Sequence, residues 1–318
     1  MNISDTKIGK WLAWFATVFG LFIVVIKDFI GADKNTSDLI TSITVCTLLF
    51  LSFIILIVRE ITLSRKIKYV SINKYLHNCI HDLRDWSTFL FQKLNDIKSQ
   101  QINIEDINSI SINQLSSMLT ELASAFSILT GASCRTAIKT IYEKNGRLYV
   151  TALARDKISM QENLNKDEQR YKDNSDPVND NEDFEMLYSK FSLKIRCFFC
   201  NDLTKKRFYK NTSFKVYGQP SDNIDLIASI NSIIGKSEKW TLPYKSTIVW
   251  PIQQQGASFL TIKHKECFGF LCIDSESRNV FNKDWDIYIG AEVADALYHP
   301  LFLYKEIFYL SQTSQEKL

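Results

Sequence analysis

The stretch from residue 198 to 247 contains the side-chain types that a pocket for a small, ring-bearing anion needs. Aromatic rings could stack on a ligand ring, polar groups could orient it, and a basic run could neutralise phosphate. The candidate ligand-binding residues are Phe198, Asn201, Asp202, Lys205, Lys206, Arg207, Tyr209, Tyr244, Ser246 and Thr247. Small-molecule sites combine apolar surface with a few placed polar groups. Two plainer interpretations stay open: a solvated loop for the basic run, and core packing for the aromatic residues.

Catalytic and metal-binding patterns are scarce. The sequence has no phosphate-binding P-loop, dinucleotide-binding glycine motif or nucleophile elbow, and it has four histidines in all. Asp202 and Asp274 could act as acid or base, although an aspartate at a strand end more often accepts hydrogen bonds in a turn. Cys197 and Cys200 could hold zinc, but residues three apart in a strand point to opposite faces. We therefore expect no enzyme activity, no catalytic residues, no metal site and no cofactor.

Composition and charge restrict the compartment and the partners. The 318 residues carry a net charge of +3, which is too small to indicate a nucleic-acid partner. Seven cysteines without the spacing of a disulfide framework suit a reducing environment. The length allows about two domains. Nearly all the charge lies beyond the first sixty residues, so the N-terminal part must differ in kind from the rest.

Leu39–Val58 is a run of twenty residues without a charge. At about 1.5 Å per residue it matches the roughly 30 Å hydrocarbon core of a bilayer. Trp11–Ile26 adds sixteen uncharged residues, and the two runs predict a transmembrane hairpin in an inner (cytoplasmic) membrane. Basic residues after the second run place both termini in the cytoplasm by the positive-inside rule. The alternatives are a cleaved signal peptide for the first run and a buried helix for the second.

Apolar residues recur at steps of three and four along the next segment, as in a coiled-coil seam. They are Tyr69, Ile72, Leu76, Cys79, Leu83, Trp86 and Leu90. The seam predicts a helical stalk that self-associates into a homo-oligomer. A helix that lies on its own domain explains the same spacing equally well. Ser99–Ser109, which is mostly polar, is interpreted as a hinge.

The remainder predicts an α+β domain in which helices pack on an antiparallel sheet. A helix at Ile112–Leu129, stopped by Gly131, precedes two strands joined at Asn145-Gly146, the strongest short hairpin signal. Lys157–Glu185 is interpreted as a polar, mobile loop that buries nothing. The further elements expected are a short helix at Phe184–Phe191, a strand at Leu193–Cys200, a helix from Ser221 to Gly235, strands at Ser246–Ile252 and Cys267–Ile273, and a closing helix at Asn282–Tyr309.

Three segments near the C-terminus follow one another in a recognisable order: Ser246–Gln253, Phe268–Ser275 and Val280–Tyr288. A strand ending in a proline and a polar turn precedes a glycine-led strand that ends at Asp-Ser, and a Phe and an acidic residue open the last helix. In this order the segments resemble the C-terminal half of a GAF domain, and the resemblance covers roughly residues 110–310. The signature of the cyclic-nucleotide-binding members is echoed only in Asn279, Phe281, Lys283 and Asp284, which disfavours a cyclic mononucleotide ligand.

Together these features divide the chain into a transmembrane hairpin (1–60), a helical stalk and hinge (61–109), a GAF-like sensor domain (110–310) and a tail (311–318). The resemblance implies a membrane-anchored cytoplasmic sensor that binds a small ligand, a nucleotide among the candidates, and couples it to the hairpin. The layout is similar to that of membrane effectors in bacterial anti-phage nucleotide signalling, which is an analogy of architecture. The alternatives are a ligand-free GAF-like module for dimerisation or partner docking, and an enzyme with an unrecognised site.

Overall fold

The computed structural model describes Gly20 and residues 36–97, 103–164, 176–189, 197–206, 209–218, 240–253 and 267–315. The chain divides into two compact units, Met1–Ile67 and Lys68–Leu318. Apart from Gly20, the predicted first span at Trp11–Ile26 lies outside the described residues. The predicted helix from Ser221 to Gly235 and the predicted site residue Arg207 also lie outside them.

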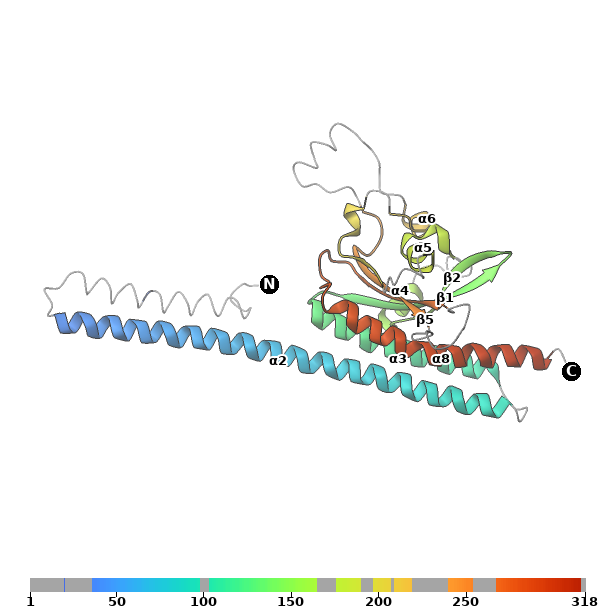
Figure 1. Ribbon diagram of the computed structural model, residues 1–318, viewed down its shortest axis with the longest axis horizontal. Helices are drawn as coiled ribbons and strands as arrows, with labels where there is room; N and C mark the ends of the chain where they lie inside the picture. Colours follow the sequence, from blue (N-terminus) through green and yellow to red (C-terminus); the bar gives the residue numbers. More distant parts are fainter. Residues whose placement is uncertain are drawn as a thin grey trace, which may run out of the picture. The chain divides into compact units, whose positions relative to one another are not determined.

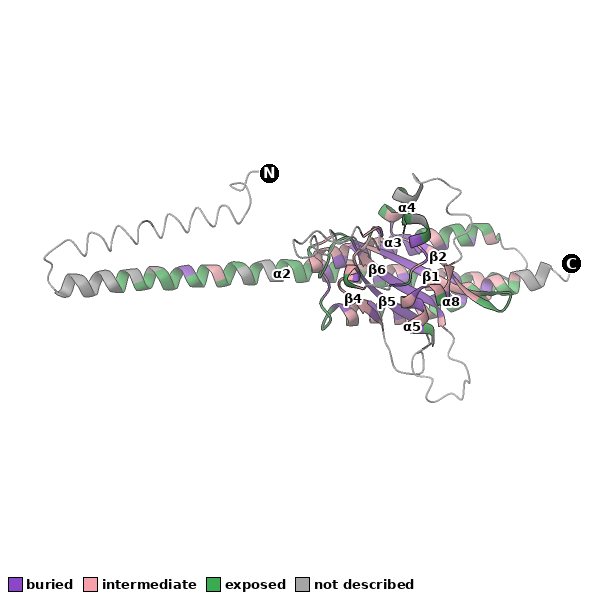
Figure 2. Cartoon of the chain, turned by 90° about the horizontal axis from the view of Figure 1, so that it is seen from above, coloured by how far each residue is buried: buried purple, intermediate pink, exposed green. Residues whose placement is uncertain are grey.

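Apart from Gly20, the described part of the first unit is the beginning of helix α2, which runs from Thr36 to Ile97. Eight large apolar side chains between Val45 and Val58 are exposed, from 41% to 65% (Figure 2). Among the residues whose side chains are described, no helix is long and apolar enough to cross a membrane. The side chains of residues 36–43, Cys46 and Leu49 lie outside that description, so the span at Leu39–Val58 stays a prediction.

The second unit is built on one antiparallel sheet of six strands. The strands are β1 (Cys134–Lys144), β2 (Arg147–Arg155), β3 (Asp176–Pro177), β4 (Phe198–Cys200), β5 (Ser246–Gln253) and β6 (Cys267–Ser275). Their order across the sheet is β3-β2-β1-β6-β5-β4, and neighbouring strands are antiparallel. The predicted α+β class with an antiparallel sheet is therefore confirmed.

Local backbone geometry explains two of these pairings. Asn145 and Gly146 have φ values of 54° and 71°, the left-handed values that a two-residue hairpin turn needs, which confirms the predicted β1–β2 hairpin. β6 pairs with the other edge of β1. At that contact a Cβ on Gly269 would lie 1.9 Å from the carbonyl oxygen of Lys139, so only glycine permits the two backbones to approach.

The helices of the second unit are α3 (Ile104–Thr130), α4 (Lys157–Leu164), α5 (Glu182–Ser189), α6 (Phe214–Tyr217) and α8 (Asp286–Gln315), with the 3-10 turns η3 (Val178–Asp180) and η5 (Leu203–Lys205). The side chain of Asn103 caps α3 by accepting from the N–H of Glu105 at 3.1 Å. Gly131, with φ 72°, ends the helix and donates to the carbonyl of Ser127 at 2.9 Å. The predicted stop is confirmed, whereas the predicted hinge is wrong from Ile104 onwards because the Asn103 cap starts the helix there.

Helices lie on both faces of the sheet (Figure 1). α3 and α8 cover one face, and α5 and α6 lie on the opposite side. The part of α2 that belongs to the second unit lies against α3 and α8. Gln114 of α3 donates to the carbonyl of Asp82 at 3.4 Å, and the rings of Trp86 and Tyr304 are 6.1 Å apart between centroids.

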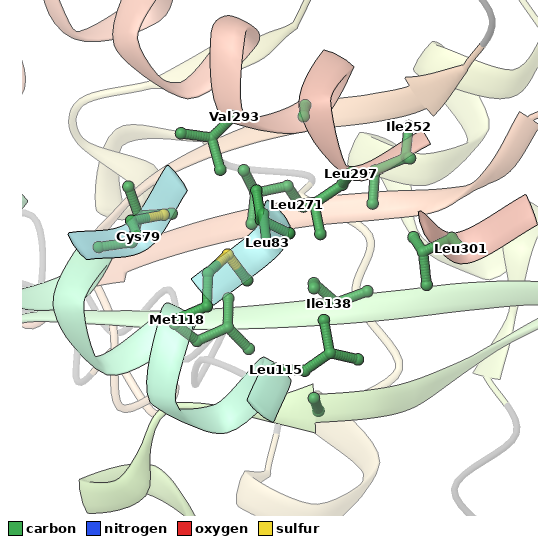
Figure 3. Close-up of a cluster of buried hydrophobic side chains, with 14 of the residues drawn as sticks. Cys79, Leu83, Leu115, Met118, Ile138, Ile252, Leu271, Val293, Leu297 and Leu301 are labelled. Carbon is green, nitrogen blue, oxygen red and sulfur yellow. The ribbon is translucent and has the colours of Figure 1, made fainter. Parts of the chain in front are cut away.

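The seam predicted along α2 is buried in the first hydrophobic core. Cys79, Leu83, Trp86 and Leu90 are each 4% exposed or less. Figure 3 shows Cys79 and Leu83 among side chains of α3, α8 and the sheet. Of the two interpretations left open by the spacing, the structure supports a helix that lies on its own domain. The first seam residue, Tyr69, is 65% exposed and takes no part in this core.

The polar stretch Lys157–Glu185 is not a loop throughout, contrary to the prediction. It contains α4, β3, η3 and the start of α5, while residues 165–175 lie outside the described residues. Val178 and Phe184 are 1% and 2% exposed, so the segment does bury apolar surface. Asn181 supports the turn between them by donating from Nδ2 to the carbonyl of Pro177 at 2.9 Å. The two buried apolar residues and the pairing of β3 with β2 attach the segment to the sheet.

The closing helix begins at Asp286, four residues later than predicted. The reason is local, because the carboxylate of Asp286 accepts from the N–H of Asn282 at 2.8 Å and holds residues 282–285 as a turn. Gly290 of α8 is also constrained: a Cβ there would lie 2.2 Å from the ring of Trp250. α8 therefore packs on β5 through a glycine.

Leu83→Ala should lower the free energy of unfolding of the full chain by about 2 to 5 kcal/mol, because it leaves a cavity in the core beneath α2. Ile80→Ala, nearly one turn away, is the matched control, since Ile80 is 46% exposed. Its cost should be about 0.5 kcal/mol or less. Urea unfolding followed by circular dichroism measures both. Two equally small effects, accompanied by dissociation of an oligomer, would instead identify the seam as an interface between copies.

Candidate functional site

The face of the sheet opposite α3 and α8 carries a second buried cluster that is rich in aromatic side chains. Its members are Val150, Val178, Phe184, Leu187, Phe198, Cys200, Leu203, Tyr209, Phe214, Leu242, Val249, Phe270 and Cys272. Strand alternation separates the two cores. On β6, Leu271 and Ile273 belong to the first core, whereas Phe270 and Cys272 belong to this second cluster.

A pocket of about 400 Å³ adjoins the second cluster. Its walls are Glu182 and Glu185, three residues apart on one side of α5, and Lys206, Tyr209 and Lys210 from the segment that begins at η5. The lining combines one aromatic ring with four charged side chains, the mixture that small-molecule sites use. This pocket is therefore the candidate site in the described part of the chain.

Hydrogen bonds hold Tyr209 in place from behind the pocket. Its hydroxyl donates to Oδ2 of Asp183 at 3.4 Å and accepts from Nδ2 of Asn211 at 3.2 Å. The same amide donates to the hydroxyl of Tyr244 at 3.0 Å, and Nε1 of Trp240 donates to the carbonyl of Tyr244 at 2.7 Å. The aromatic wall of the pocket is thus fixed without any ligand.

Burial controls the charge state of the groups behind Tyr209. Burial raises the pKa of Asp183 to about 6, against the positive charge of Lys139, which lowers it. Burial also raises the pKa of Asp274, against a hydrogen bond from Thr247. The pKa of Tyr209 is raised by burial well above its ordinary value, so its hydroxyl stays a neutral donor. With a pKa of about 6, Asp183 changes its charge in mildly acid solution.

Lys206 is already engaged within the pocket. Its ammonium group pairs with the carboxylate of Glu182, and its Nζ lies 4.7 Å from the centroid of the Phe198 ring. Lys205 points elsewhere: its side chain is 77% exposed and lies 3.6 Å from the carboxylate of Asp202. The described members of the predicted basic run therefore do not converge on one anion-binding point.

Four of the ten predicted site residues come together here, namely Phe198, Lys206, Tyr209 and Tyr244. The rings of Phe198 and Tyr209 are 6.3 Å apart between centroids, at an interplanar angle of 29°. The sequence left core packing open as an alternative role for the aromatic residues. That alternative holds for Phe198, which is 2% exposed. Tyr209 belongs to the core and also lines the pocket.

The other described members of the predicted set bond within the sheet and its loops. Asn201 donates to a backbone carbonyl of the loop before α8 at 2.7 Å, and Ser246 donates to a carbonyl just after β6 at 2.6 Å. Asp202 accepts from a backbone N–H at the start of η5 at 3.2 Å. Thr247 is 1% exposed and bonds to Asp274. A role for these residues in contacting a ligand stays a prediction.

Sequence reasoning missed Glu182, Asp183 and Glu185 because they lie in the stretch interpreted as a loop. A signal for them was present. Asn181 followed by a run of acids and then by apolar residues is the pattern of a helix N-terminus, since acids favour the first turn. Asn211 carried no such signal, because its role is to join Tyr209, two residues before it, to Tyr244, which is 33 residues away.

The cysteine pair of this region is structural. Cys197 packs against the first core and Cys200 lies in the second cluster, so the two point to opposite faces of the sheet as predicted. Burial raises the pKa of the Cys197 thiol to about 11. Across the described ranges, no three His, Cys, Asp or Glu side chains are grouped so that they could hold a metal ion.

Asp183→Asn should remove a pH dependence from the stability of the protein. The folded-state pKa of Asp183 is about 6, above its ordinary value, so the native state binds this proton more tightly than the unfolded chain does. The tighter binding of this proton stabilises the folded protein at low pH, and that stabilisation is lost as the pH rises through the folded-state pKa. Between about pH 4 and pH 7 the free energy of unfolding of the parent should fall by roughly 2 to 3 kcal/mol relative to Asp183→Asn.

Urea unfolding at a series of pH values measures this difference. Val178→Ala is the control, because it removes buried apolar surface beside α5 without removing a titratable group. It should lower stability by the same amount at every pH. A parent and an Asp183→Asn variant with the same pH profile would contradict a buried carboxyl that is protonated in the folded state.

No protein-family model and no curated protein matches the chain. Among solved structures it is similar to one described as the structure of the GAF domain, at 11% identity and a TM-score of 0.38, covering 71% of this chain and 87% of that chain. It is similar to the GAF domain of an Acinetobacter phosphoenolpyruvate-protein phosphotransferase, at 8% identity and a TM-score of 0.35, covering 72% and 93%. It is also similar to a type II free methionine-R-sulfoxide reductase from Thermoplasma acidophilum, at 15% identity and a TM-score of 0.34, covering 63% and 96%. At such TM-scores these likenesses carry no argument, and the fold rests on the strand order and registers described above.

Proposed function

We propose that the second unit is a GAF-like sensor that binds a small ligand in the pocket beside Tyr209. One observation carries this proposal: the aromatic wall of the pocket is fixed by hydrogen bonds to Asp183 and Asn211, neither of which lines the pocket. A wall that is ordered in advance binds a ligand at little cost in conformational entropy. The resemblance of residues 246–288 to a GAF domain agrees with a sensory role.

The state of the reactive groups favours binding over catalysis. Burial raises the pKa of Cys197 to about 11 and that of Cys267 to about 12, so both thiols are protonated at neutral pH and are poor nucleophiles. Asp183, whose pKa is also raised, accepts from Tyr209 behind the pocket wall. The position of Asp183 therefore suits a structural role, in which it holds the aromatic wall of the pocket in place.

A membrane anchor at Leu39–Val58 is the second part of the proposal. Its twenty uncharged residues are supported by the exposed apolar side chains between Val45 and Val58, which at about 100° per residue lie around most of α2, while the remaining side carries Phe53, an apolar residue that is 8% exposed. A helix that is apolar all round is buried in a protein core or in lipid. The first span, at Trp11–Ile26, and the cytoplasmic position of both termini rest on the sequence alone.

The third part of the proposal is that ligand binding is coupled to α2 through the sheet. The pocket adjoins one face of the sheet, the later part of α2 lies over the other, and the same central strands contribute to both cores. α2 continues without a break from Thr36 to Ile97. A nucleotide ligand and a role in anti-phage defence have no support beyond the sequence analogy, and the first experiment below includes nucleotides for that reason.

A ligand of this pocket should raise the melting temperature of the full chain in detergent. Stabilisation grows as RT ln(1 + [L]/Kd) and reaches about 2.7 kcal/mol at a hundredfold excess over Kd. Metabolite extracts and pure nucleotides are the probes. Lys210→Trp places a ring in the pocket wall and should abolish the shift, whereas Lys215→Trp, at an exposed position of α6 outside the pocket, should preserve it. A parent protein that no probe stabilises would favour the ligand-free docking module.

If the two predicted spans form a membrane hairpin, a cysteine introduced at Asn35 between them should react with a membrane-impermeant maleimide that is added to intact cells. The background is Cys46→Ser, because Cys46 lies within the predicted second span and the other six cysteines face the cytoplasm in the proposed topology. Mass spectrometry of the labelled protein measures the result. Labelling at this position only after the cells are lysed would contradict the topology.

A further inference from the structure

An ammonium group already sits in the candidate site, and it belongs to the protein itself. Nζ of Lys206 lies 4.7 Å from the centroid of the Phe198 ring and 6.0 Å from that of Tyr209, and it pairs with the carboxylate of Glu182. Aromatic faces and carboxylates both attract positive charge, and together they bind organic cations. The site has the composition of a cation site whose occupant is a lysine of the same chain.

The site does not depend on Lys206 for its shape. Phe198 is held in β4 and is 2% exposed. Tyr209 is held through its hydroxyl by Asp183 and Asn211. Glu182 is held at the start of α5, where its N–H donates to a backbone carbonyl at 3.0 Å. The two rings and the backbone of Glu182 would therefore stay in place if the lysine side chain left.

The side chain of Lys206 can leave. It is 35% exposed, and that of its partner Glu182 is 33% exposed, so water competes for both charges. Ion pairs that are exposed to this degree contribute little free energy. The backbone of Lys206 is held by a hydrogen bond to the carbonyl of Leu203 at 2.9 Å, so only the flexible stem has to move.

We propose that the pocket binds an organic ammonium ion, a primary or quaternary amine, whose charge replaces that of Lys206 between Phe198, Tyr209 and Glu182. The inference rests on the proposed function and names its class of ligand. The other two charged walls, Glu185 and Lys210, carry one charge of each sign, so the preference for a cation rests on Phe198, Tyr209 and Glu182. The anionic ligand predicted from the basic run is disfavoured, because the charge of Lys206 is already neutralised by Glu182.

Lys206 then competes with the ligand for the site, as a cation that is tethered to the protein. A site that is free only part of the time binds with an affinity reduced by that fraction. Lys206→Met keeps the apolar stem and removes the charge, so it should tighten binding of an ammonium ion, by about tenfold if Lys206 occupies the site nine-tenths of the time. Glu182→Gln removes the counter-charge and should weaken binding by about tenfold or more.

Calorimetric titration of the full chain in detergent tests this with choline as the probe. Neohexanol, the uncharged carbon analogue of choline, has the same shape and is the matched ligand control. Choline should bind Lys206→Met about tenfold more tightly than it binds the parent, and neohexanol should bind neither detectably. Lys215→Met removes an exposed lysine of α6 outside the pocket, and it should bind choline as the parent does.

Melting without ligand establishes that each variant is folded. Choline binding that Lys206→Met does not tighten, an analogue that binds as well as choline, or no choline binding to Lys206→Met at tens of millimolar would each overturn the cation site. If an extract or a nucleotide nevertheless stabilises the parent, and Lys210→Trp removes that effect, the sensor function stands and only its ligand class is wrong. If no probe stabilises the parent or Lys206→Met, both proposals fail.

Discussion

Both faces of the second unit depend on the pairing of β1 with β6, which joins the β1–β2 hairpin and β3 to β5 and β4. Gly269 permits this pairing, because any side chain there would collide with the backbone of Lys139. In the observed register Ile138 and Leu271 meet on the first face, while Lys139 and Phe270 meet on the second. A slip of one residue would exchange the two sets of side chains. The register therefore decides which residues build the helix-covered core and which surround the pocket.

The two faces differ in chemistry as a result. The second face keeps two acids, Asp183 and Asp274, whose pKa values are raised by burial and lowered again by the charge of Lys139. Buried carboxyls are costly unless they are paired or protonated, and perturbed groups of this kind cluster at functional sites. Buried Asp183 has a structural role here, because it accepts the hydrogen bond that orients Tyr209. The hydrogen bond between Tyr209 and Asp183 thus links a buried acid of this face to the wall of the pocket.

Local signals allowed much of this fold to be predicted, because the end of α3 at Gly131 and the turn at Asn145-Gly146 each depend on a few adjacent residues. The site could not be predicted in the same way. Lys206 and Glu182 are 24 residues apart, and the sequence reveals their charges but not that they pair. The seam along α2 shows the same limit, since the spacing of its apolar residues indicates a buried face without identifying what covers it. The cover turned out to be α3, α8 and the sheet.

The contact between α2 and α3 is unlike the strand pairings in how it is held. Within the described residues, Nε1 of Trp86 and Oγ of Ser111 are buried without a hydrogen-bond partner, and each such group costs about 1 to 3 kcal/mol. Two side-chain hydrogen bonds that join these helices, at 3.3 Å and 3.4 Å, are longer than the usual range. Apolar contact therefore supplies most of the attraction, and apolar contact is non-directional. Strand pairing fixes a register through directed hydrogen bonds, whereas the position of α2 on the domain is set by how its apolar seam packs.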